Sequence, residues 1–365
     1  MGDYKQRDYR AASPAVIKVI GVGGGGSNAV NRMFREPIPG VDYIAINTDA
    51  QALLRCEVPI RMQIGERLTQ GLGVGGDPEK GRQAAEESRD ELAEMLRGAH
   101  MVFLAAGMGG GTGTGAAPII AECAREAGAL TVAVVTKPFL FEGEKRIQTA
   151  LNGLHRLKEK VDAYIVIPNE RLKLWSDQKL TMGSAFRLAD EVLRQGVQSI
   201  AELVTTPGEI NLDFADVKAV LAAGGAAWLG IGRGKGESRA VEAARTALNC
   251  PLLETTVEGA RGVLFNITGG DNLTLSEVHA AAEAIKEKMD PEATIFFGMV
   301  SDPKMEDEVR ITLVAAGLAG EESGPLREEE LAAYLPGDGH PQQAADLDLP
   351  PFIRRSYPPR RWRTP

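Results

Sequence analysis

The chain has 365 residues and a formal net charge of -9, with 41 basic and 50 acidic side chains. This length can bury a sizeable core and favours two domains. The acidic balance argues against general nucleic-acid binding, which needs a dense basic surface. The sequence shows neither a signal-peptide pattern nor a long apolar span. We therefore expect a cytoplasmic protein with no nucleic-acid partner and no direct insertion into a membrane.

The cysteines and histidines limit the chemistry further. Cys56, Cys123 and Cys250 lie far apart without C-x-x-C spacing, and the four histidines are scattered. We expect reduced cysteines that serve in packing. The same spacing argues against a zinc site or a histidine-based triad.

Residues 1–13 are polar and mixed in charge, which predicts a disordered N-terminal tail. From residue 14 onward, short apolar runs alternate with segments of helical spacing. This rhythm is typical of a doubly wound, mostly parallel α/β sheet, and we assign residues 14–183 to one domain of that class. The predicted strands cover residues 15–20, 41–47, 101–106, 130–137 and 163–167.

The first strand leads into a glycine-rich turn over residues 21–28 and then into a helix predicted from Ala29. The first, third and sixth residues of this turn fit G-x-G-x-x-G. Asp49 follows roughly 20 residues later, as a dinucleotide-binding fold requires. An NAD(P)-dependent oxidoreductase is therefore one candidate.

A second glycine run, Gly109 to Gly115, follows another buried-strand pattern and leads into a helix with Pro118 predicted in its first turn. Such a turn aims several free backbone N–H groups at one point, where anions bind. Hydroxyls of Thr112 and Thr114 can add hydrogen bonds to phosphate. A flexible turn is the alternative. Two cradles suit a nucleoside triphosphate, and the string G-x-x-x-x-G-K-[ST] is absent.

Further along the chain, a glycine-dense loop at residues 69–77 and a charged helix predicted over 78–96 are expected to border the same crevice. An apolar stripe at helical spacing then predicts one long helix from Ser184 to Thr205. This central connecting helix, assigned to residues 184–208, is long enough to link two domains. Thr206-Pro207-Gly208 predicts its end.

Residues 209–317 read as a second, smaller α/β domain with a mainly β core. It contains no further phosphate-loop pattern. Contact with another molecule and a purely structural role both remain open for it. The predicted strands cover residues 228–232, 262–268, 294–299 and 308–313, and the predicted helices cover 238–248 and 275–289.

At the start of this domain stand Asn211, Asp213 and Asp216. The two aspartates are three residues apart, so in a starting helix both carboxylates point the same way. Such a pair can orient a water for attack on phosphorus. Helix capping is the alternative, because Asp favours the N-cap and the first turn. The acids also lie on the far side of the long helix from the glycine loops, so within one molecule they need not reach a nucleotide.

Taken together, these motifs resemble the tubulin/FtsZ family in its bacterial form. The resemblance covers roughly residues 14 to 317. It implies a GTP-binding domain, a central helix and a C-terminal activation domain in a head-to-tail homopolymer that hydrolyses GTP. It further implies a role in bacterial cell division at mid-cell beneath the membrane, with Asn211, Asp213 and Asp216 of one subunit acting on the GTP of its neighbour. The motifs, in sequence order, are residues 21–28, 47–51, 107–118, 136–139 with 141–143, and 211–217.

The resemblance also assigns residues to GTP or GDP, with Mg²⁺ on the phosphates and mostly water as its other ligands. For Glu142 and Arg146, matched to ribose and nucleotide contacts, a surface ion pair is the alternative. For Phe186, matched to base stacking, core filling is the alternative. Asp190 would accept hydrogen bonds from guanine N1 and N2. The phosphate contacts are Gly24, Gly25, Gly26, Ser27, Asn28, Gly110, Gly111, Thr112 and Gly113, and Asn169 is a further nucleotide contact.

The C-terminal part of the chain differs from the domains in composition. In residues 318–345 all but one of the charged side chains, Arg327, are acidic, and several Pro and Gly are present, which predicts a disordered acidic linker. Residues 346–365 follow as a partner-binding peptide with a basic end. Within it, Asp346 to Arg355 resembles the family's terminal peptide for membrane tethers and regulatory division proteins. The basic and aromatic residues at 360–363 extend beyond that motif and could contact anionic lipid or another filament.

Three hypotheses follow from the sequence. The first is a GTPase that is active on polymerisation. The second is an NAD(P)-dependent oxidoreductase, and the third is a tubulin-like scaffold that binds nucleotide with little hydrolysis.

Overall fold

The computed structural model describes residues 15–172, 181–205, 209–210, 212–222, 224–250 and 257–318. The tail predicted at 1–13, nearly all of the linker predicted at 318–345, the peptide at 346–365 and Asn211 lie outside these residues. So does the helix end predicted at residues 206–208. No helix in the described part of the chain is both long and apolar enough to span a membrane.

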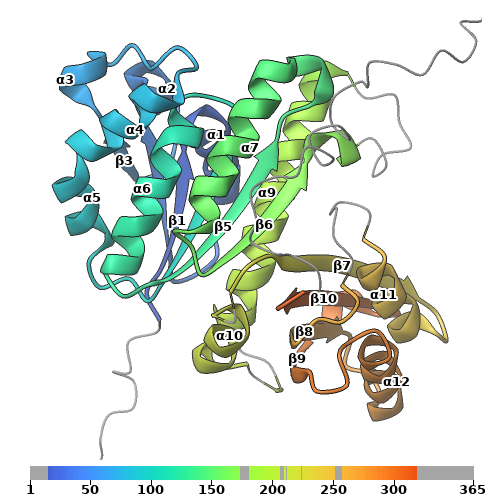
Figure 1. Ribbon diagram of the computed structural model, residues 1–365. Coiled ribbons are helices and arrows are strands. Elements are labelled where there is room, and N and C mark those ends of the chain that lie inside the picture. The colour runs from blue at the N-terminus through green and yellow to red at the C-terminus, as the bar shows by residue number, and fades with distance from the viewer. Residues whose placement is uncertain are drawn as a thin grey trace, which may run out of the picture. The chain divides into compact units, whose positions relative to one another are not determined.

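The N-terminal half forms a six-stranded parallel sheet in the order β3-β2-β1-β4-β5-β6, which confirms the predicted fold class (Figure 1). The order reverses between β1 and β4, the point where ligands of such sheets collect. Two of the predicted strands, β2 and β5, match the structure residue for residue. The strands are β1 (Ile17–Val22), β2 (Val41–Asn47), β3 (Ile60–Gln63), β4 (Met101–Gly107), β5 (Leu130–Lys137) and β6 (Ala163–Pro168).

Helices cover both faces of this sheet. One face packs α1 and α9 against strand residues such as Val19 and Phe103, and the other packs α4, α5, α6 and α7 against residues such as Ile20 and Leu104. Helix α9, of 24 residues, starts two residues before the predicted position. The helices are α1 (Gly23–Arg35), α2 (Ala50–Leu54), α3 (Glu66–Thr69), α4 (Pro78–Glu87), α5 (Arg89–Leu96), α6 (Thr112–Glu126), α7 (Glu144–Lys158) and α9 (Met182–Thr205), with 3-10 turns η2 (Leu140–Glu142) and η3 (Asn169–Arg171).

Three local predictions were wrong. The first helix begins at Gly23 rather than Ala29, so the glycine turn is itself the first helical turn. Pro118 lies inside α6 rather than in its first turn, because α6 already starts at Thr112 in the second glycine run. The helix predicted over 78–96 is interrupted at Ser88, whose hydroxyl accepts a hydrogen bond from the N–H of Gly65 at 3.1 Å.

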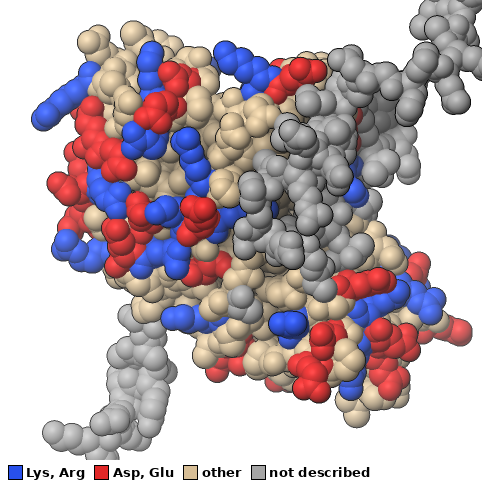
Figure 2. All heavy atoms as spheres, viewed as in Figure 1, with Lys and Arg blue, Asp and Glu red and all other residues tan. Residues whose placement is uncertain are grey.

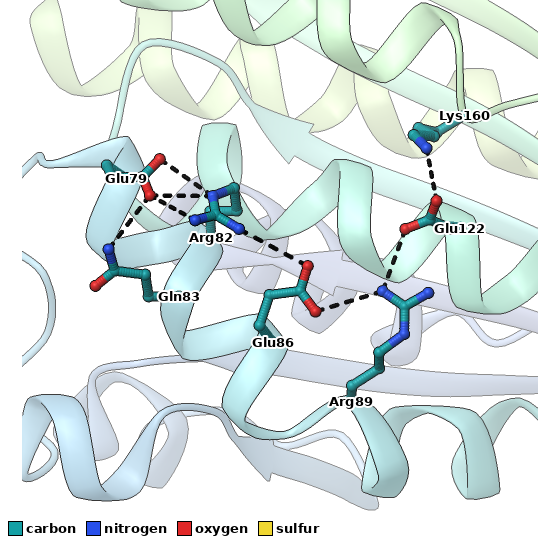
Figure 3. A network of polar contacts seen from close by, with 7 residues as sticks. All are labelled: Glu79, Arg82, Gln83, Glu86, Arg89, Glu122 and Lys160. Carbon is teal, nitrogen blue, oxygen red and sulfur yellow. Dashed lines mark hydrogen bonds and ion pairs between the residues drawn. The ribbon is translucent and has the colours of Figure 1, made fainter.

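Helices α4, α5 and α6 are joined by a network of ion pairs (Figure 3). Arg89, the first residue of α5, contacts Glu86 at 3.4 Å, Glu122 at 3.2 Å and Glu126 at 2.9 Å. Lys160 contacts Glu122 from the other side at 2.6 Å. This network ties the helix before the break to α6, which carries the second glycine run. Figure 2 shows that basic and acidic side chains are interspersed on the visible face of the helices around it.

Residues after α9 form a second unit with a four-stranded mixed sheet in the order β7-β10-β8-β9. Strand β10 is antiparallel to β7 and β8, whereas β8 and β9 are parallel. This confirms the predicted smaller domain with a mainly β core. Its last predicted helix ends at Lys286 rather than at residue 289. The elements are α10 (Phe214–Leu221), β7 (Ala227–Lys235), α11 (Arg239–Leu248), β8 (Gly262–Gly269), α12 (Leu275–Lys286), β9 (Thr294–Ser301), η4 (Pro303–Met305) and β10 (Glu308–Ala316).

Candidate functional site

The two glycine loops follow β1 and β4, which are neighbours at the reversal of the sheet, and the loops contact each other. Gly23 has a φ of +70°, and a Cβ there would lie 2.7 Å from the amide nitrogen of Gly113. Only glycine combines this backbone conformation with so close an approach. The start of α1 and the start of α6 are therefore held side by side, with the free N–H groups of two long helices at one place.

The phosphate contacts predicted in the first loop divide into two sets. Gly24, Gly25 and Asn28 are exposed, and no atom lies within 4 Å of where a Cβ of Gly24 would stand. Gly26 is buried against the carbonyl of Ala105 on β4. Ser27 is only 2% exposed, and its hydroxyl has no hydrogen-bond partner among the described residues. An orphaned buried hydroxyl at a helix N-terminus fits an anionic ligand there.

The second loop is held from beneath by α4 and the loop before it. A Cβ at Gly111 would lie 2.4 Å from Val74 Cγ2, and a Cβ at Gly81 would lie 2.4 Å from the carbonyl oxygen of Gly111. The predicted bordering loop at residues 69–77 is thereby confirmed. Gly110, like Gly24, borders open space, since no atom lies within 4 Å of its Cβ position.

The threonines of the second loop have different partners. Thr112 shares a hydrogen bond of 2.7 Å with the hydroxyl of Thr48, which follows β2. Thr114 accepts a hydrogen bond from the N–H of Gly109 at 2.8 Å and is 3% exposed. Thr114 therefore braces the loop from inside, and its contact with phosphate stays a prediction. Thr48 belongs to the motif at residues 47–51, but the sequence assigned it no role in the site.

Glu142 and Arg146 form an ion pair of 3.1 Å between the end of η2 and α7. The Glu142 side chain is 7% exposed and also accepts a hydrogen bond from the N–H of Phe139 at 2.8 Å. The alternative of an ion pair is thus confirmed, although the side chain of Glu142 is largely buried. The Arg146 side chain is half exposed. A Cβ built at Gly109 would lie 2.8 Å from the carbonyl oxygen of Arg146. The pair therefore adjoins the second loop, and its contact with ribose stays a prediction.

Asn169 lies at the carboxyl end of β6, where η3 begins. It is 5% exposed, and its Oδ1 has no hydrogen-bond partner among the residues that the structure describes. A buried amide oxygen without a partner is uncommon in proteins. With Ser27, it makes a second orphaned polar atom among the residues assigned to the nucleotide.

Phe186 and Asp190 stand one turn apart on α9. Phe186 is 41% exposed and contacts the ring of Phe139 edge to face, with centroids 5.5 Å apart, so the core-filling alternative was wrong. Asp190 pairs with Arg32 of α1 at 3.1 Å and is 14% exposed. Burial raises the pKa of Asp190 to about 6, although the guanidinium of Arg32 acts in the opposite direction.

Arg32 was not predicted as part of the site. A signal was present, because Arg32 and Asn28 are four residues apart and share one face of α1.

Asp213 and Asp216 form a capping box at the start of α10. The Asp213 carboxylate accepts from the N–H of Asp216 at 3.1 Å, and the Asp216 carboxylate accepts from the N–H of Asp213 at 3.2 Å. The capping alternative is therefore confirmed. Asp213 is exposed and Asp216 is partly exposed, so both carboxylates keep free lone pairs for a further partner. Their catalytic role stays a prediction.

One ring contact places these acids relative to the glycine loops. His100, directly before β4, lies edge to face against Phe214, the residue after Asp213, with centroids 6.4 Å apart. The second glycine loop follows the opposite end of the same strand, after Gly107. A strand of this length spans about 20 Å. The acids of one chain thus lie near the amino end of β4 and its phosphate loop lies at the carboxyl end.

Asp49, which supported the dinucleotide alternative, is engaged locally. Its carboxylate caps α2 by accepting from the N–H groups of Gln51 at 2.9 Å and Ala52 at 3.1 Å. The ribose role that a dinucleotide fold requires would have to compete with this cap. The described residues also contain no cluster of three His, Cys, Asp or Glu side chains placed to hold a metal ion.

Comparisons with known proteins agree with this geometry. The Tubulin/FtsZ family GTPase domain matches residues 16–176, and the FtsZ family C-terminal domain matches residues 225–319. An FtsZ dimer from M. jannaschii, in the empty state, is 46% identical over 85% of this chain and 90% of its own, with a TM-score of 0.80. A point mutant of M. jannaschii FtsZ is 45% identical over 85% of this chain and 93% of its own, with a TM-score of 0.79.

A more distant likeness extends to the fold alone. CetZ1 from Haloferax volcanii, a GDP-bound monomer, is 22% identical over 87% of this chain and 98% of its own, with a TM-score of 0.74. Since the two domain matches and the M. jannaschii structures cover most of the sequence, the chain belongs to the tubulin/FtsZ family, with a GTPase domain followed by an FtsZ C-terminal domain.

Proposed function

We propose that this protein is a GTP-dependent, self-assembling filament protein of bacterial cell division, and that GTP is hydrolysed at the interface between successive subunits. The observation that carries this proposal is the separation of the two halves of the site. The phosphate loops follow the carboxyl ends of β1 and β4, whereas Asp213 and Asp216 flank Phe214, whose ring contacts His100 directly before the amino end of β4. A second copy, stacked head to tail, would bring its acids to the first copy's GTP.

Exposed apolar side chains support such stacking. Leu54, Leu68 and Leu72 follow β2 and are 78%, 43% and 83% exposed. In the second unit, Ile210, which is 40% exposed, stands beside the acids, and Leu275 is 85% exposed. Head-to-tail association needs two different surfaces of this kind on each subunit. The M. jannaschii FtsZ relative was solved as a dimer, and the distant CetZ2 was solved as a GTPγS-bound protofilament.

In the proposed reaction, the backbone N–H groups at the starts of α1 and α6 hold the phosphates of GTP. Ser27 and Asn169 supply their unpartnered buried oxygens to the nucleotide. Phe186 stacks on the base, and Asp190 accepts from the guanine N1 and N2 donors. Asp213 and Asp216 of the neighbour, with Asn211, orient the attacking water and take up its proton. Mg²⁺ would bind to the phosphate oxygens with water as its remaining ligands.

The cellular setting is also proposed. The protein would act in the cytoplasm and assemble at the mid-cell division site beneath the membrane. The peptide from Asp346 to Arg355 would bind membrane-tethering and regulatory division proteins.

A nucleotide-binding scaffold with little hydrolysis is the second candidate. One observation favours it: both carboxylates are already used in the capping box of α10. The two candidates differ in what Asp213→Asn does, because Asn caps a helix about as well as Asp but carries no charge.

A mixing experiment tests the proposal. Asp213→Asn protein is added in increasing fractions to wild-type protein at constant total concentration, and phosphate release is measured. Each variant subunit should silence the GTP of its neighbour, so turnover per wild-type subunit should fall as the variant fraction rises. The matched control is Asp42→Ala, which removes an exposed carboxylate from β2. Turnover that equals the wild-type rate at every Asp213→Asn fraction would overturn the shared site, whereas wild-type protein that scarcely releases phosphate once assembled would favour the scaffold.

A further inference from the structure

His100 occupies a fixed position at the base of the sheet. Its N–H donates to the carbonyl of Val16 at 2.9 Å, and its carbonyl accepts from the N–H of Leu130 at 2.9 Å. The ring is held as well, because its Nδ1 accepts from the N–H of Val16 at 3.0 Å. Backbone and ring are thus bound to the residues that precede β1 and begin β5. A ring held in this way can locate another group that packs against it.

The group that packs against it is Phe214, at an interplanar angle of 77°. Phe214 is the first residue of α10 and stands between Asp213, the N-cap, and Asp216. Because the capping box links the two acids through their backbone N–H groups, a movement of Phe214 carries both carboxylates with it.

The rest of α10 is held differently. Val217, Val220 and Leu221 are at most 2% exposed, and a Cβ at Gly262 of β8 would lie 3.1 Å from Val220. These residues fix the body of the helix on the second sheet. The contact with His100 is made at the first turn, where the acids are, and it comes from the GTPase domain. It therefore links that turn to the sheet that carries the phosphate loops.

We propose that His100 is a positioning residue for the catalytic acids. Its ring holds Phe214, and through the capping box it holds Asp213 and Asp216 in the orientation that they present to the neighbouring subunit's GTP. The inference rests on the proposed function, because it presumes that these acids act in the assembled filament. By this inference, β4 connects the phosphate loop at its carboxyl end with the contact between His100 and Phe214 at its amino end, and that contact orients the acids.

The test compares His100→Ala with His100→Phe in the full-length chain. Ala removes the ring, whereas Phe keeps an edge-to-face partner for Phe214 and loses the acceptor nitrogen. The matched control is His155→Ala, since the His155 side chain is 53% exposed on α7. Three quantities are measured for each protein: GTP affinity of the monomer, assembly by light scattering, and phosphate release per assembled subunit at saturating GTP.

For His100→Ala, we expect GTP affinity and assembly within about twofold of wild type, because the phosphate loops lie at the other end of the sheet. Turnover per assembled subunit should fall by about fivefold to tenfold. An edge-to-face aromatic pair favours the contacted orientation of Phe214 over other orientations by about this factor, and His100→Ala removes that preference. His100→Phe should recover turnover to within about twofold, and His155→Ala should leave all three quantities unchanged.

A double-mutant cycle protects the test against a folding defect. Phe214→Leu keeps an apolar side chain on α10 but removes the ring contact. Its effect on turnover should match that of His100→Ala, and the double variant should lose no more than either single variant. Equal loss of GTP affinity and turnover in His100→Ala, or fully additive losses in the cycle, would overturn the positioning role.

Asp213→Asn, measured in parallel, distinguishes a failure of the positioning role of His100 from a failure of the shared GTPase site. If Asp213→Asn loses turnover while His100→Ala hydrolyses at the wild-type rate, the inference on His100 is wrong and the shared site stands. If Asp213→Asn itself hydrolyses at the wild-type rate, the proposed function fails, and the positioning role fails with it.

Discussion

Acidification should weaken guanine-nucleotide binding through Asp190. Burial raises the pKa of this carboxyl to about 6, so it is mostly ionised at neutral pH and mostly protonated near pH 5. Only the ionised form accepts from both guanine N1 and N2, because a protonated carboxyl keeps a hydrogen on one oxygen. The ionised fraction falls from about nine-tenths at about pH 7 to about one-tenth at about pH 5, which predicts about a tenfold loss of affinity.

The assay is equilibrium binding of GDP to the monomer over this pH range, with Asp190→Asn as the matched variant. The Asn side chain does not titrate, so the variant reports any effect of the phosphate groups and the rest of the protein. It should bind about 10-fold to 100-fold more weakly at neutral pH, since it leaves one guanine donor unpaired. The difference in slope between the two proteins measures Asp190. Parallel pH profiles would refute the assignment of Asp190 to the base.

Three further predictions concern the second glycine loop, the ion-pair network beside it and an ion pair of the second domain. Gly81→Ala should weaken GTP binding by about tenfold or more, because its methyl group would meet the phosphate-loop carbonyl at 2.4 Å, whereas Gly183→Ala on α9, with only one atom within 4 Å, should bind normally in the same titration. Arg89→Met should lower the free energy of unfolding in urea by about 1 kcal/mol, with a smaller loss at about 1 M salt, because its ion pairs are partly exposed; an equal loss at every salt concentration would contradict this. The hydrogen bond from Arg239, together with those from Thr274, lowers the pKa of Glu277 to about 2, so the stabilisation from this carboxylate is complete above about pH 4.5 and is lost as the pH falls toward 2; Arg239→Met should reduce this pH dependence in unfolding curves, and an unchanged dependence would contradict the assignment.

The fold could be predicted wherever burial alone decides the local structure. The strands at 41–47 and 130–137 are interior to the sheet, and most of their residues are buried, so each contains a clear apolar stretch. Strand β3 was missed because it is a short edge strand with Ile60 and Arg61 exposed, so its sequence has no apolar run. At the break, the Ser88 hydroxyl accepts from the N–H of Gly65, a partner 23 residues away along the chain, and no local pattern reveals this contact.

The candidate site also divides into features that the local sequence predicts and features that depend on contacts between distant parts of the chain. Glycine loops after two strands were visible in the sequence, because only glycine permits the backbone approach between Gly23 and Gly113. The partners of the charged groups could not be predicted from the sequence, because the pairing of Asp190 with Arg32 is set by how α9 packs on α1. The aspartates at the start of α10 had two interpretations in the sequence, helix capping and a catalytic pair. In the structure they cap the helix and remain accessible, so both interpretations are compatible with it.

The shared site is tested most directly by the GTPase rate per molecule as a function of protein concentration, for wild type and for Asp213→Asn. If GTP is hydrolysed only between subunits, the wild-type rate per molecule should be close to zero at low concentration and rise steeply once filaments form. The variant should bind GTP and assemble, yet stay at the low rate throughout. A wild-type rate per molecule that does not change with concentration, or a variant as active as wild type, would contradict the account.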